Sequence, residues 1–378
     1  MNVFIHALNA RLGGGQTYLY NLLNHLPKEI SLQVTLFVPA STQSLSLPAN
    51  VHIREGGKWL ENPFIRAAWE RLYLPLILRK EKPDVLFCPG GVVATKAPKS
   101  CKVVTIFRNM IPFDMKQRKR YAYGYKRLRN WMLERIMLSS MRNADLVIFI
   151  SEYAKKIIEE RLGGRMRKTI VIPHGVNNVF KKTLITESKP DWLPQGDYLL
   201  YVSSIDVYKM QVEVVNAFAL LNPLERNLNL VLVGPEINKN YSQQVNNVIS
   251  QHGIGDAVLM PGSVSYDKLP QLYKNAVINI FASECENCPN ILLEMMASGR
   301  PVVCSSYPPM PEFGGDTVVY FDPEYPETLA QGLEKLLGNP EQQERLADLA
   351  YEKSNEYRWD DTAGRTWQAI AALGGKQT

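Results

Sequence analysis

The feature that most constrains the fold of this chain is a repeated alternation of short apolar runs with amphipathic helical stretches. The runs are apolar throughout, as in strands of a parallel sheet that is covered on both faces. A first series comprises Val3–Leu8, Val34–Val38, Asp84–Pro89, Val103–Phe107, Asp145–Ile150 and Thr169–Pro173. A second series comprises Tyr198–Ser203, Leu230–Gly234, Val258–Pro261, Val277–Phe281, Val302–Cys304 and Val318–Phe321. This order of elements predicts an α/β protein made of two doubly wound, Rossmann-like domains in tandem.

Between the two series, residues 181–196 are mostly polar and contain Pro190, Pro194 and Gly196, which predicts an interdomain linker. A length of 378 residues also favours two domains over one. We therefore assign residues 1–182 to a first domain and residues 183–357 to a second. Residues 358–378 end a stretch of entirely helical pattern that begins near Glu341.

The composition is typical of a globular protein in water, with 46% hydrophobic and 21% charged residues. No apolar run reaches the roughly 18 residues of a transmembrane helix. The N-terminal run lacks a basic start and is expected to be the first strand and not a signal peptide. Five scattered cysteines, an odd number, favour reduced thiols in a cytosolic setting.

The segment from Glu286 to Glu294 reads Glu-Asn-Cys-Pro-Asn-Ile-Leu-Leu-Glu and places two carboxylates eight positions apart. Its surroundings predict a strand, a loop, a short helix and another strand. We expect Pro289 at the first helical position and Gly299 just past the helix end, where Pro301 prevents continuation. Glu286 then lies in the loop and Glu294 on the second turn. Because the N-terminus of a helix suits a phosphate group and carboxylates accept hydrogen bonds from sugar hydroxyls, a nucleotide-sugar matches this layout.

This segment resembles the E-x7-E motif of the retaining GT-B glycosyltransferases of family 4, in the variant that begins Glu-Asn-Cys-Pro-Asn. The resemblance covers nearly the whole chain and is more specific in the second domain than in the first. It implies a cleft between two Rossmann-like domains and a last helix that crosses back to the first domain. It also implies that Glu286 faces the donor sugar and that Glu294 binds the nucleotide ribose. Without the surrounding motif, two such glutamates would be expected to be solvated charges.

The same resemblance implies further donor-site residues in the second domain. Lys209, after the first strand of that domain, would neutralise the diphosphate leaving group, whereas a lone lysine there is usually a solvated residue. Ser204 stands where the family commonly has an arginine, so one cationic contact to the diphosphate is expected to be missing. The remaining residues expected at the donor site are Gly234, Val264, Asn287, Asn290 and Ile291.

In the first domain, Gly13, Gly14 and Gly15 follow the first strand, where glycines let the backbone approach a ligand closely. They do not form the G-x-G-x-x-G fingerprint of dinucleotide sites, and a plain tight turn is the alternative. The resemblance implies that Gly14 and Gly15 approach the donor phosphates and the acceptor. Arg108 replaces a histidine that many family members have; it would contact phosphate or an anionic acceptor, or form a structural salt bridge. His174 resembles a structural or cleft-lining loop residue.

Together these features imply a retaining transfer of a hexose-type sugar from a nucleotide diphosphate sugar to an acceptor hydroxyl of a lipid-linked or cell-surface glycan precursor. Glu286, Lys209 and Arg108 are the expected catalytic residues. No cofactor and no metal are expected, and the chain has no Asp-x-Asp motif. A glycoside hydrolase fits poorly, because only one of the two glutamates would reach the sugar. A nucleotide-sugar epimerase or hydrolase of GT-B fold, or a non-catalytic scaffold, are the alternatives.

Basic residues gather in one stretch: Lys116–Arg135 contains eight Lys or Arg and one Glu, a net charge of +7 in a chain of net charge +6. Tyr121, Tyr123, Tyr125 and Trp131 lie among them, and this combination suits an anionic membrane surface. An ordinary solvated basic helix is the alternative. Nucleic acid is not expected, because no recognition motif accompanies the patch. We expect a cytoplasmic protein, and its peripheral attachment to the inner face of the cell membrane is a hypothesis.

Cys285 and Cys288 form a C-x-x-C inside the motif segment. A zinc site would need two more ligands, and no His or Cys pair of suitable spacing follows. A redox pair is an alternative. Because the pair falls inside the nucleotide-sugar motif, we treat it as coincidental.

Overall fold

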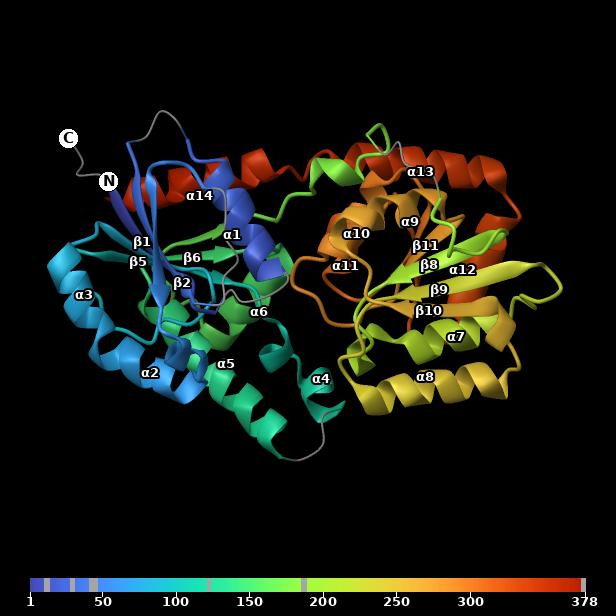
Figure 1. Cartoon of the computed structure of the whole chain (residues 1–378), viewed down its shortest axis with the longest axis horizontal. Coiled ribbons are helices and arrows are strands. Elements are labelled where there is room, and N and C mark those ends of the chain that lie inside the picture. The colour runs from blue at the N-terminus through green and yellow to red at the C-terminus, as the bar shows by residue number, and fades with distance from the viewer. Residues whose placement is uncertain (10–13, 28–30, 41–46, 121–123, 185–188, 375–378) are drawn as a thin grey trace. The chain divides into compact units, whose positions relative to one another are not determined.

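The computed structural model describes residues 1–9, 14–27, 31–40, 47–120, 124–184 and 189–374. Its contacts divide the chain into two compact units. Unit 1 comprises Met1–Gly175 and Trp359–Thr378, and unit 2 comprises Val176–Arg358. Each unit is built around one parallel sheet that is covered by helices, as the two series of apolar runs predict (Figure 1).

The sheet of unit 1 has seven strands in the order β3-β2-β1-β4-β5-β6-β7, and all its pairings are parallel. The strands are β1 (Asn2–His6), β2 (Gln33–Pro39), β3 (Val51–Gly56), β4 (Val85–Cys88), β5 (Lys102–Phe107), β6 (Leu146–Phe149) and β7 (Thr169–Val171). The sequence predicts six of them and misses β3. That edge strand exposes His52–Glu55, so no apolar run marks it.

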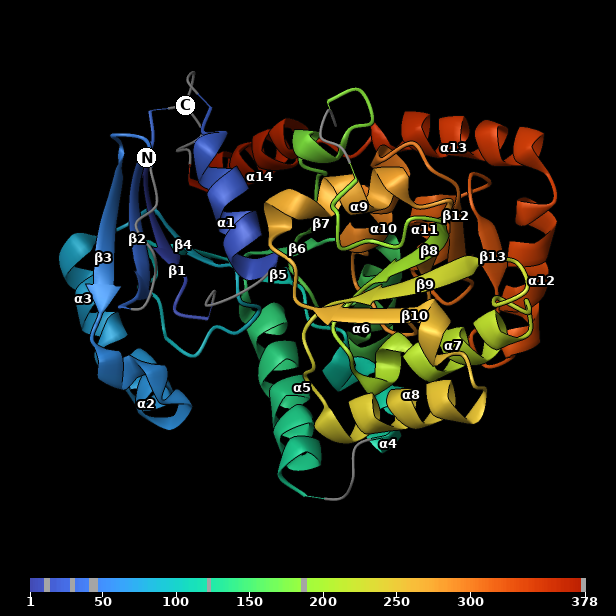
Figure 2. The ribbon, with the colours of Figure 1, turned by 45° about the vertical axis from the view of Figure 1, so that its right-hand side comes forward.

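The helices of unit 1 are α1 (Gly14–Asn24), α2 (Pro63–Leu72), α3 (Leu74–Glu81), α4 (Met115–Arg120), α5 (Tyr125–Asn143), α6 (Glu152–Leu162) and α14 (Trp359–Gly374). Leu74 and Leu78 of α3 pack on Phe4 and Leu86 of the sheet. Figures 1 and 2 show α2, α3 and α5 on the side of unit 1 that faces away from α14. The basic stretch that the sequence places on one helix is divided at Gly124, whose φ of 146° is not helical, into α4 and α5.

The sheet of unit 2 has six parallel strands in the order β10-β9-β8-β11-β12-β13. They are β8 (Asp197–Val202), β9 (Leu228–Val233), β10 (Val258–Gly262), β11 (Ile278–Phe281), β12 (Val302–Ser305) and β13 (Val319–Phe321). All six correspond to predicted apolar runs. Their agreement follows from burial, since β8, β9, β11 and β12 are almost wholly buried.

The helices of unit 2 are α7 (Gln211–Ala219), α8 (Lys239–Gln251), α9 (Leu269–Asn275), α10 (Asn290–Ala297), α11 (Met310–Gly314), α12 (Pro326–Leu337) and α13 (Pro340–Ser354). Figure 2 shows α7 and α8 on one face of the sheet and α9 and α10 on the other. This is the doubly wound arrangement that the alternation of elements predicts.

Residues 176–182 belong to unit 2, whereas the sequence-based ranges place them in the first domain. The short 3-10 turn Asn178–Phe180 explains the difference. Phe180 is buried against the rings of Tyr266 and Tyr273, and the Lys182 N–H donates a hydrogen bond to the Ala297 carbonyl oxygen at 2.9 Å. The described part of the expected linker, residues 181–184 and 189–196, is therefore part of unit 2 and not a boundary between the units.

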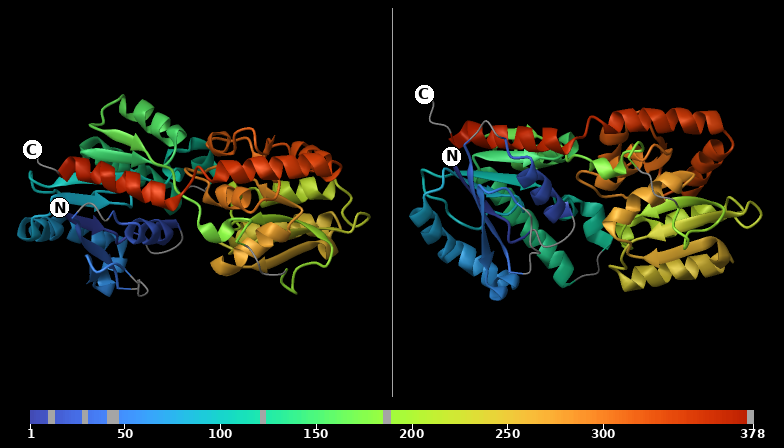
Figure 3. Two further views of the ribbon diagram at one scale, coloured as in Figure 1. Left: turned by 90° about the horizontal axis from the view of Figure 1, so that it is seen from above. Right: turned by 45° about the horizontal axis from the view of Figure 1, so that its top comes forward.

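The C-terminal stretch forms two helices, α13 in unit 2 and α14 in unit 1, with residues 355–358 between them. Within unit 1, α14 packs beside α1 (Figure 3). The Trp367 Nε1–H donates a hydrogen bond to the Leu22 carbonyl oxygen at 2.9 Å. Trp367 is among the largest fully buried side chains. The last helix thus completes the first unit, as the resemblance implies.

Candidate functional site

The strand order of unit 2 reverses between β8 and β11, since β9 and β10 lie beyond β8 whereas β12 and β13 lie beyond β11. Ligands of open parallel sheets bind at such a switch point, outside the carboxyl ends of the strands. The loop after β8 carries Lys209, and the loop after β11 carries Glu286. The two loops are joined by a hydrogen bond from the Glu284 N–H to the Tyr208 carbonyl oxygen at 2.9 Å.

Lys209 ends a short 3-10 turn, Val207–Lys209, which begins where the Asp206 side chain accepts a hydrogen bond from the Val207 N–H at 2.8 Å. Met210 follows with a positive φ of 57° and joins this turn to α7. The Tyr201 hydroxyl, on β8, donates to the Lys209 carbonyl oxygen at 2.7 Å. The backbone at Lys209 is therefore fixed from both sides. The sequence predicts this lysine at the start of a helix, but it ends the 3-10 turn that lies just before α7.

The Lys209 ammonium forms an ion pair with Oε1 of Glu286, and the two side chains are only 8% and 18% exposed. Burial by itself lowers the pKa of Lys209, but the charge of Glu286 and the hydrogen bond to it raise this pKa above its ordinary value. The lysine consequently keeps its positive charge at neutral pH in a place with little solvent. A cation in such a place attracts a diphosphate more strongly than an exposed lysine does.

The helix that follows Glu286 presents its N-terminus without a side-chain cap among the described residues. The sequence predicts Pro289 as the first helical residue. In the structure Pro289 is the N-cap, and α10 begins one residue later, at Asn290. The N–H of Asn290 donates a hydrogen bond to the Cys288 carbonyl oxygen at 3.0 Å, whereas the next N–H groups, that of Ile291 included, have no acceptor within the helix. Gly299 lies just past the other end with a φ of 69°, as predicted. The start of α10 therefore has the donors and the dipole that suit an anion.

Glu294 lies on the second turn of α10, as predicted, and is 7% exposed. Its two oxygens accept hydrogen bonds from two tyrosine hydroxyls, Tyr266 to Oε1 at 3.0 Å and Tyr273 to Oε2 at 3.3 Å. Burial raises the pKa of Glu294 from 4.5 to about 7, although both hydrogen bonds act to lower it. A carboxylate has about four acceptor positions, so two tyrosines leave capacity for ribose hydroxyls.

Sequence reasoning did not include Tyr266 and Tyr273 in the site. Their spacing of seven residues, close to two helical turns, was the available signal. That spacing does not identify Glu294 as the shared acceptor, because α9 and α10 meet only through the packing of unit 2.

Ser204 and Gly234 lie together at the ends of β8 and β9. Gly234 has a φ of 149°, and a Cβ built there would collide with the Ser203 carbonyl oxygen. The Gln211 side chain donates hydrogen bonds to Ser203 Oγ at 2.8 Å and to the Ser204 carbonyl oxygen at 2.9 Å. The glycine is therefore required for the close approach of the two loops, independently of any ligand.

The other predicted residues of unit 2 occupy loops at the carboxyl edge of the sheet or the start of α10. Asn287 is buried, whereas Val264, Asn290 and Ile291 are half-buried. Two of the predicted residues of this unit are in direct side-chain contact in the described structure, because Lys209 forms a hydrogen-bonded ion pair with Glu286.

Arg108, after β5 in unit 1, is held by a cluster of rings. Its guanidinium carbon lies 5.4 Å from the centre of the Tyr18 ring. The rings of Tyr18, His174 and Trp359 all contact one another, with 5.3 Å between the centres of Tyr18 and His174, 5.5 Å between His174 and Trp359, and 6.2 Å between Tyr18 and Trp359. Burial raises the pKa of Tyr18 to about 12, although the charge of Arg108 acts to lower it. His174 is thus buried in a structural cluster, and Arg108 is fixed on its edge.

Gly14 and Gly15 are the first residues of α1, whose first turn contains no acidic residue. Gly13, Tyr121 and Tyr123, which also enter the sequence-based interpretation, lie outside the described residues. Gly14, Gly15 and Arg108 belong to unit 1, and the other nine predicted site residues belong to unit 2.

Comparison with family models decides the family. Residues 12–179 match the model described as Glycosyltransferase Family 4, and residues 186–353 match the model described as Glycosyl transferases group 1. The chain belongs to the glycosyltransferases of family 4 and group 1. The family expected from the segment Glu286–Glu294 is confirmed at this level.

This glycosyltransferase is 32% identical to an uncharacterized glycosyltransferase of Methanocaldococcus jannaschii over 150 residues, which are 38% of this chain and 37% of the relative. It is 22% identical to the O-antigen chain mannosyltransferase B of Escherichia coli over 253 residues, which are 64% of each chain. Both alignments therefore span less than two thirds of the relative.

The solved structures that resemble this glycosyltransferase match it over almost its full length. The sucrose-phosphate synthase of Thermosynechococcus elongatus has a TM-score of 0.78 and 17% identity, and the match covers 98% of both chains. HepE of Anabaena, solved in complex with UDP-glucose, has a TM-score of 0.72 and 15% identity over 98% of this chain and 99% of that one. These likenesses confirm the predicted α/β fold of GT-B type.

All five cysteines of this glycosyltransferase, Cys285 and Cys288 included, are buried and form no disulfide bond in the described part of the chain. In the part of the chain that the structure describes, no three His, Cys, Asp or Glu side chains come together in a group that could hold a metal ion. No helix within the described ranges has the length and apolar character needed to cross a membrane.

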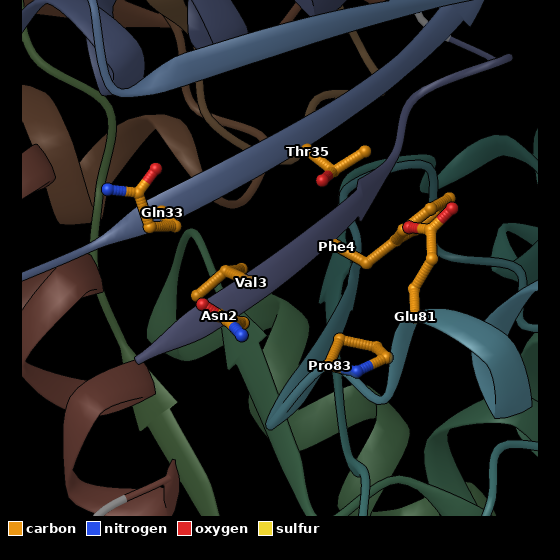
Figure 4. A pocket seen from close by; sticks show the side chains of 7 residues that line it. All are labelled: Asn2, Val3, Phe4, Gln33, Thr35, Glu81 and Pro83. Atoms are coloured by element: carbon orange, nitrogen blue, oxygen red, sulfur yellow. The ribbon is translucent and has the colours of Figure 1, made fainter.

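A cavity of about 270 Å³ lies in unit 1 (Figure 4). Its lining consists of Asn2, Val3, Phe4, Gln33, Thr35, Glu81 and Pro83. Asn2 and Gln33 are the first residues of β1 and β2. The cavity therefore lies at the amino edge of the sheet, opposite the carboxyl edge that carries Arg108, and it is not part of the candidate site.

Proposed function

We propose that this protein transfers a hexose-type sugar from a nucleotide diphosphate sugar to an acceptor hydroxyl with retention of the anomeric configuration. The observation that carries this proposal is the Lys209–Glu286 ion pair at the switch point of unit 2. A buried, charged lysine and an adjacent carboxylate match the two ends of such a donor, which are an anionic diphosphate and a ring of hydroxyl groups.

Negative charge develops on the diphosphate as the bond to the sugar breaks. Lys209 and the first N–H groups of α10 are placed to stabilise this charge, because both come from loops at the same edge of the sheet. No metal ion enters this assignment. Acceptor attack is proposed on the face from which the diphosphate leaves, and the acceptor proton passes to the departing phosphate oxygen.

Glu286 accepts hydrogen bonds from donor sugar hydroxyls, and Glu294 accepts them from the ribose. The burial of Glu294 against Tyr266 and Tyr273 supports a binding position for this carboxyl group, since the tyrosines fix its orientation. The complex of HepE with UDP-glucose supports a nucleotide-sugar as the class of donor.

For the acceptor, we assign Arg108 to an anionic group, because the Tyr18 ring holds its guanidinium at the carboxyl edge of the first sheet. An anionic, lipid-linked glycan precursor fits this assignment. The relationship to an O-antigen chain mannosyltransferase supports polysaccharide biosynthesis as the setting.

The outer face of α5 supports contact with an anionic membrane, as the basic stretch Lys116–Arg135 suggests. Tyr125, Leu128, Met132 and Ile136 recur at helical spacing, and all are exposed. Arg129 and Arg135 lie at the two sides of this apolar stripe, and both are exposed. An exposed apolar stripe between arginines is the pattern of a helix that lies in a membrane surface.

A thermal-shift panel of GDP-, UDP- and ADP-sugars tests the donor assignment. A ligand that binds only the folded state raises the melting temperature, and we expect one nucleotide class to do so. Glu294→Ala should abolish this shift while the folded fraction at room temperature stays unchanged. No shift with any nucleotide-sugar would favour a non-catalytic scaffold.

Release of the nucleotide with and without acceptor separates a transferase from its alternatives. We expect release to depend on the acceptor. Sugar release to water, or epimerised donor without acceptor, would instead indicate a hydrolase or an epimerase.

A further inference from the structure

Helix α2 of unit 1 has its apolar side chains on the outside. Glu70 is the one side chain of this helix that is fully buried, and every residue of α2 is described. Phe64, Ile65 and Leu72 are 72%, 46% and 64% exposed. A surface helix of a globular protein usually shows the opposite pattern, with its apolar stripe toward the core.

The contacts that hold α2 to the sheet are few and partly polar. Glu70 Oε1 lies 3.4 Å from His6 Nε2 at the end of β1 and 3.6 Å from Arg66 Nε. The Trp69 ring stacks on Phe37 of β2 with 5.1 Å between the ring centres. The outward apolar residues are therefore not needed for the attachment of α2 to its own unit.

The exposed apolar surface continues onto the neighbouring segments. Trp59, Tyr73 and Leu76 add to Phe64, Ile65 and Leu72, and all six are exposed large apolar side chains. We call Lys58–Lys82, which contains them, the α2–α3 surface. It carries six basic and three acidic residues, a net charge of +3. Five of the basic residues are exposed, namely Lys58, Arg71, Arg79, Lys80 and Lys82. The three acidic residues are buried or half-buried, namely Glu61, Glu70 and Glu81.

We propose that the α2–α3 surface binds an anionic lipid surface, together with the outward stripe of α5. The charge selects this occupant. A second copy of the chain packed on the same face would bring the two sets of basic residues together, whereas anionic headgroups neutralise them. Exposed aromatic and aliphatic side chains among Lys and Arg also suit the boundary between headgroups and acyl chains.

The placement of the two surfaces is consistent with one lipid plane. Right-handed crossovers put the helices between β3 and β4 and those between β5 and β6 on the same face of the first sheet. Figures 1 and 2 show α2, α3 and α5 together on the side away from α14. Two contacts on one body strengthen each other, because the second binds at high effective concentration.

Co-sedimentation of the full chain with vesicles of phosphatidylglycerol and phosphatidylcholine tests this inference, and no donor is added. Phe64→Ser/Leu72→Ser should lower the partition coefficient roughly tenfold or more, as expected from losing two buried apolar side chains. Leu128→Ser/Met132→Ser on α5 should act similarly. Because donor binding is not measured, a failure here does not bear on glycosyl transfer.

The matched control is Leu220→Ser/Ile237→Ser, which removes two side chains of similar exposure, 58% and 63%, from unit 2. It should bind vesicles like the unchanged protein, and all three variants should keep the melting temperature. Unchanged partitioning of Phe64→Ser/Leu72→Ser would overturn the proposal. So would a dimer in solution that this variant dissociates, because a second copy would then be the occupant.

Discussion

Nζ of Lys209 and Oε1 of Glu286 form a mostly buried ion pair between the loops that follow β8 and β11. In the proposed reaction each of these groups has a second partner on the donor. A diphosphate that approaches Lys209 competes with Glu286 for one cation, and Glu286 becomes more accessible to sugar hydroxyls as that competition succeeds. The pair therefore links recognition of the phosphate end of the donor to recognition of its sugar end.

Glu286→Gln removes the competing charge and keeps the size of the side chain. A nucleoside diphosphate without sugar should bind this variant about threefold to tenfold more tightly, because no carboxylate then opposes its access to Lys209. Sugar transfer should still fall by about 10²-fold or more, since the sugar loses a charged acceptor. Calorimetric titration and a steady-state assay measure the two effects. Glu236, which is exposed after β9, provides the control, and Glu236→Gln should change neither quantity. Weaker diphosphate binding by Glu286→Gln would contradict the proposed competition for Lys209.

Lys209→Met leaves the Glu286 carboxylate without its cation. Removing one partner of a buried pair costs about 3–5 kcal/mol, and we expect the lower end of this range because Glu286 is 18% exposed. The double variant Lys209→Met/Glu286→Gln should recover most of the loss, since neither charge remains. Urea unfolding of the three proteins measures the difference. Equal losses in the single and double variants would show that the two side chains are not energetically coupled.

The sequence was sufficient for the sheets wherever strands are buried on both faces. It failed at β3, whose exposed residues His52–Glu55 carry no apolar signal. It also placed a domain boundary too late, because the attachment of Phe180 to Tyr266 and Tyr273 is a tertiary contact between distant segments. Local pattern predicts an element, but not the unit on which that element packs.

The candidate site shows the same division. The motif spacing correctly places Glu294 on the second turn of α10, because the distance along a helix follows from sequence. The Lys209–Glu286 contact joins residues 77 positions apart and depends on the pairing of β8 with β11. The position of Arg108 over Tyr18 likewise depends on packing of the β5 loop against α1. None of these pairings has a signature in the local sequence.

The raised pKa of Glu294, about 7, predicts a pH dependence of donor binding. A protonated carboxyl group offers fewer acceptor positions to ribose hydroxyls than a carboxylate does. Affinity for a nucleotide-sugar should therefore increase as the pH rises through about 7 and level off near pH 8. Glu294→Gln should bind more weakly by about 1.5–3 kcal/mol and lack this dependence. Calorimetric titrations across the pH range test this, and the same slope in the variant would assign it to another group.

Glu70 predicts a pH dependence of stability. Burial raises its pKa from 4.5 to about 7, partly opposed by Arg66, so the folded protein keeps a proton that the unfolded chain releases. The stability that Glu70 contributes is fully present below about pH 4.5 and is lost as the pH rises through about 7. Burial lowers the pKa of His6 to about 4, also with Arg66, so its contribution has the opposite sign and is lost as the pH falls from about 6.5 to 4.

Glu70→Gln should remove the first of these two effects and keep the second. The free energy of unfolding of the variant, minus that of the unchanged protein, should rise between about pH 4.5 and 7 and level off above that range. Urea unfolding at several pH values measures this difference. A constant difference over that range would show that Glu70 titrates at the same pH in the folded and unfolded chain.

The ring of Tyr18 is expected to position the guanidinium of Arg108. Tyr18→Phe keeps the ring beneath the guanidinium and should leave the kinetics nearly unchanged, whereas Tyr18→Leu removes it. The loss of a cation–π contact is worth about 0.5–2 kcal/mol, so Tyr18→Leu should lower kcat/KM for an anionic acceptor about twofold to thirtyfold. The donor KM should stay constant in both variants, because Arg108 is assigned to the acceptor. If Tyr18→Leu instead raises the donor KM and leaves the acceptor KM unchanged, Arg108 acts on the donor phosphate, and its assignment must be reversed.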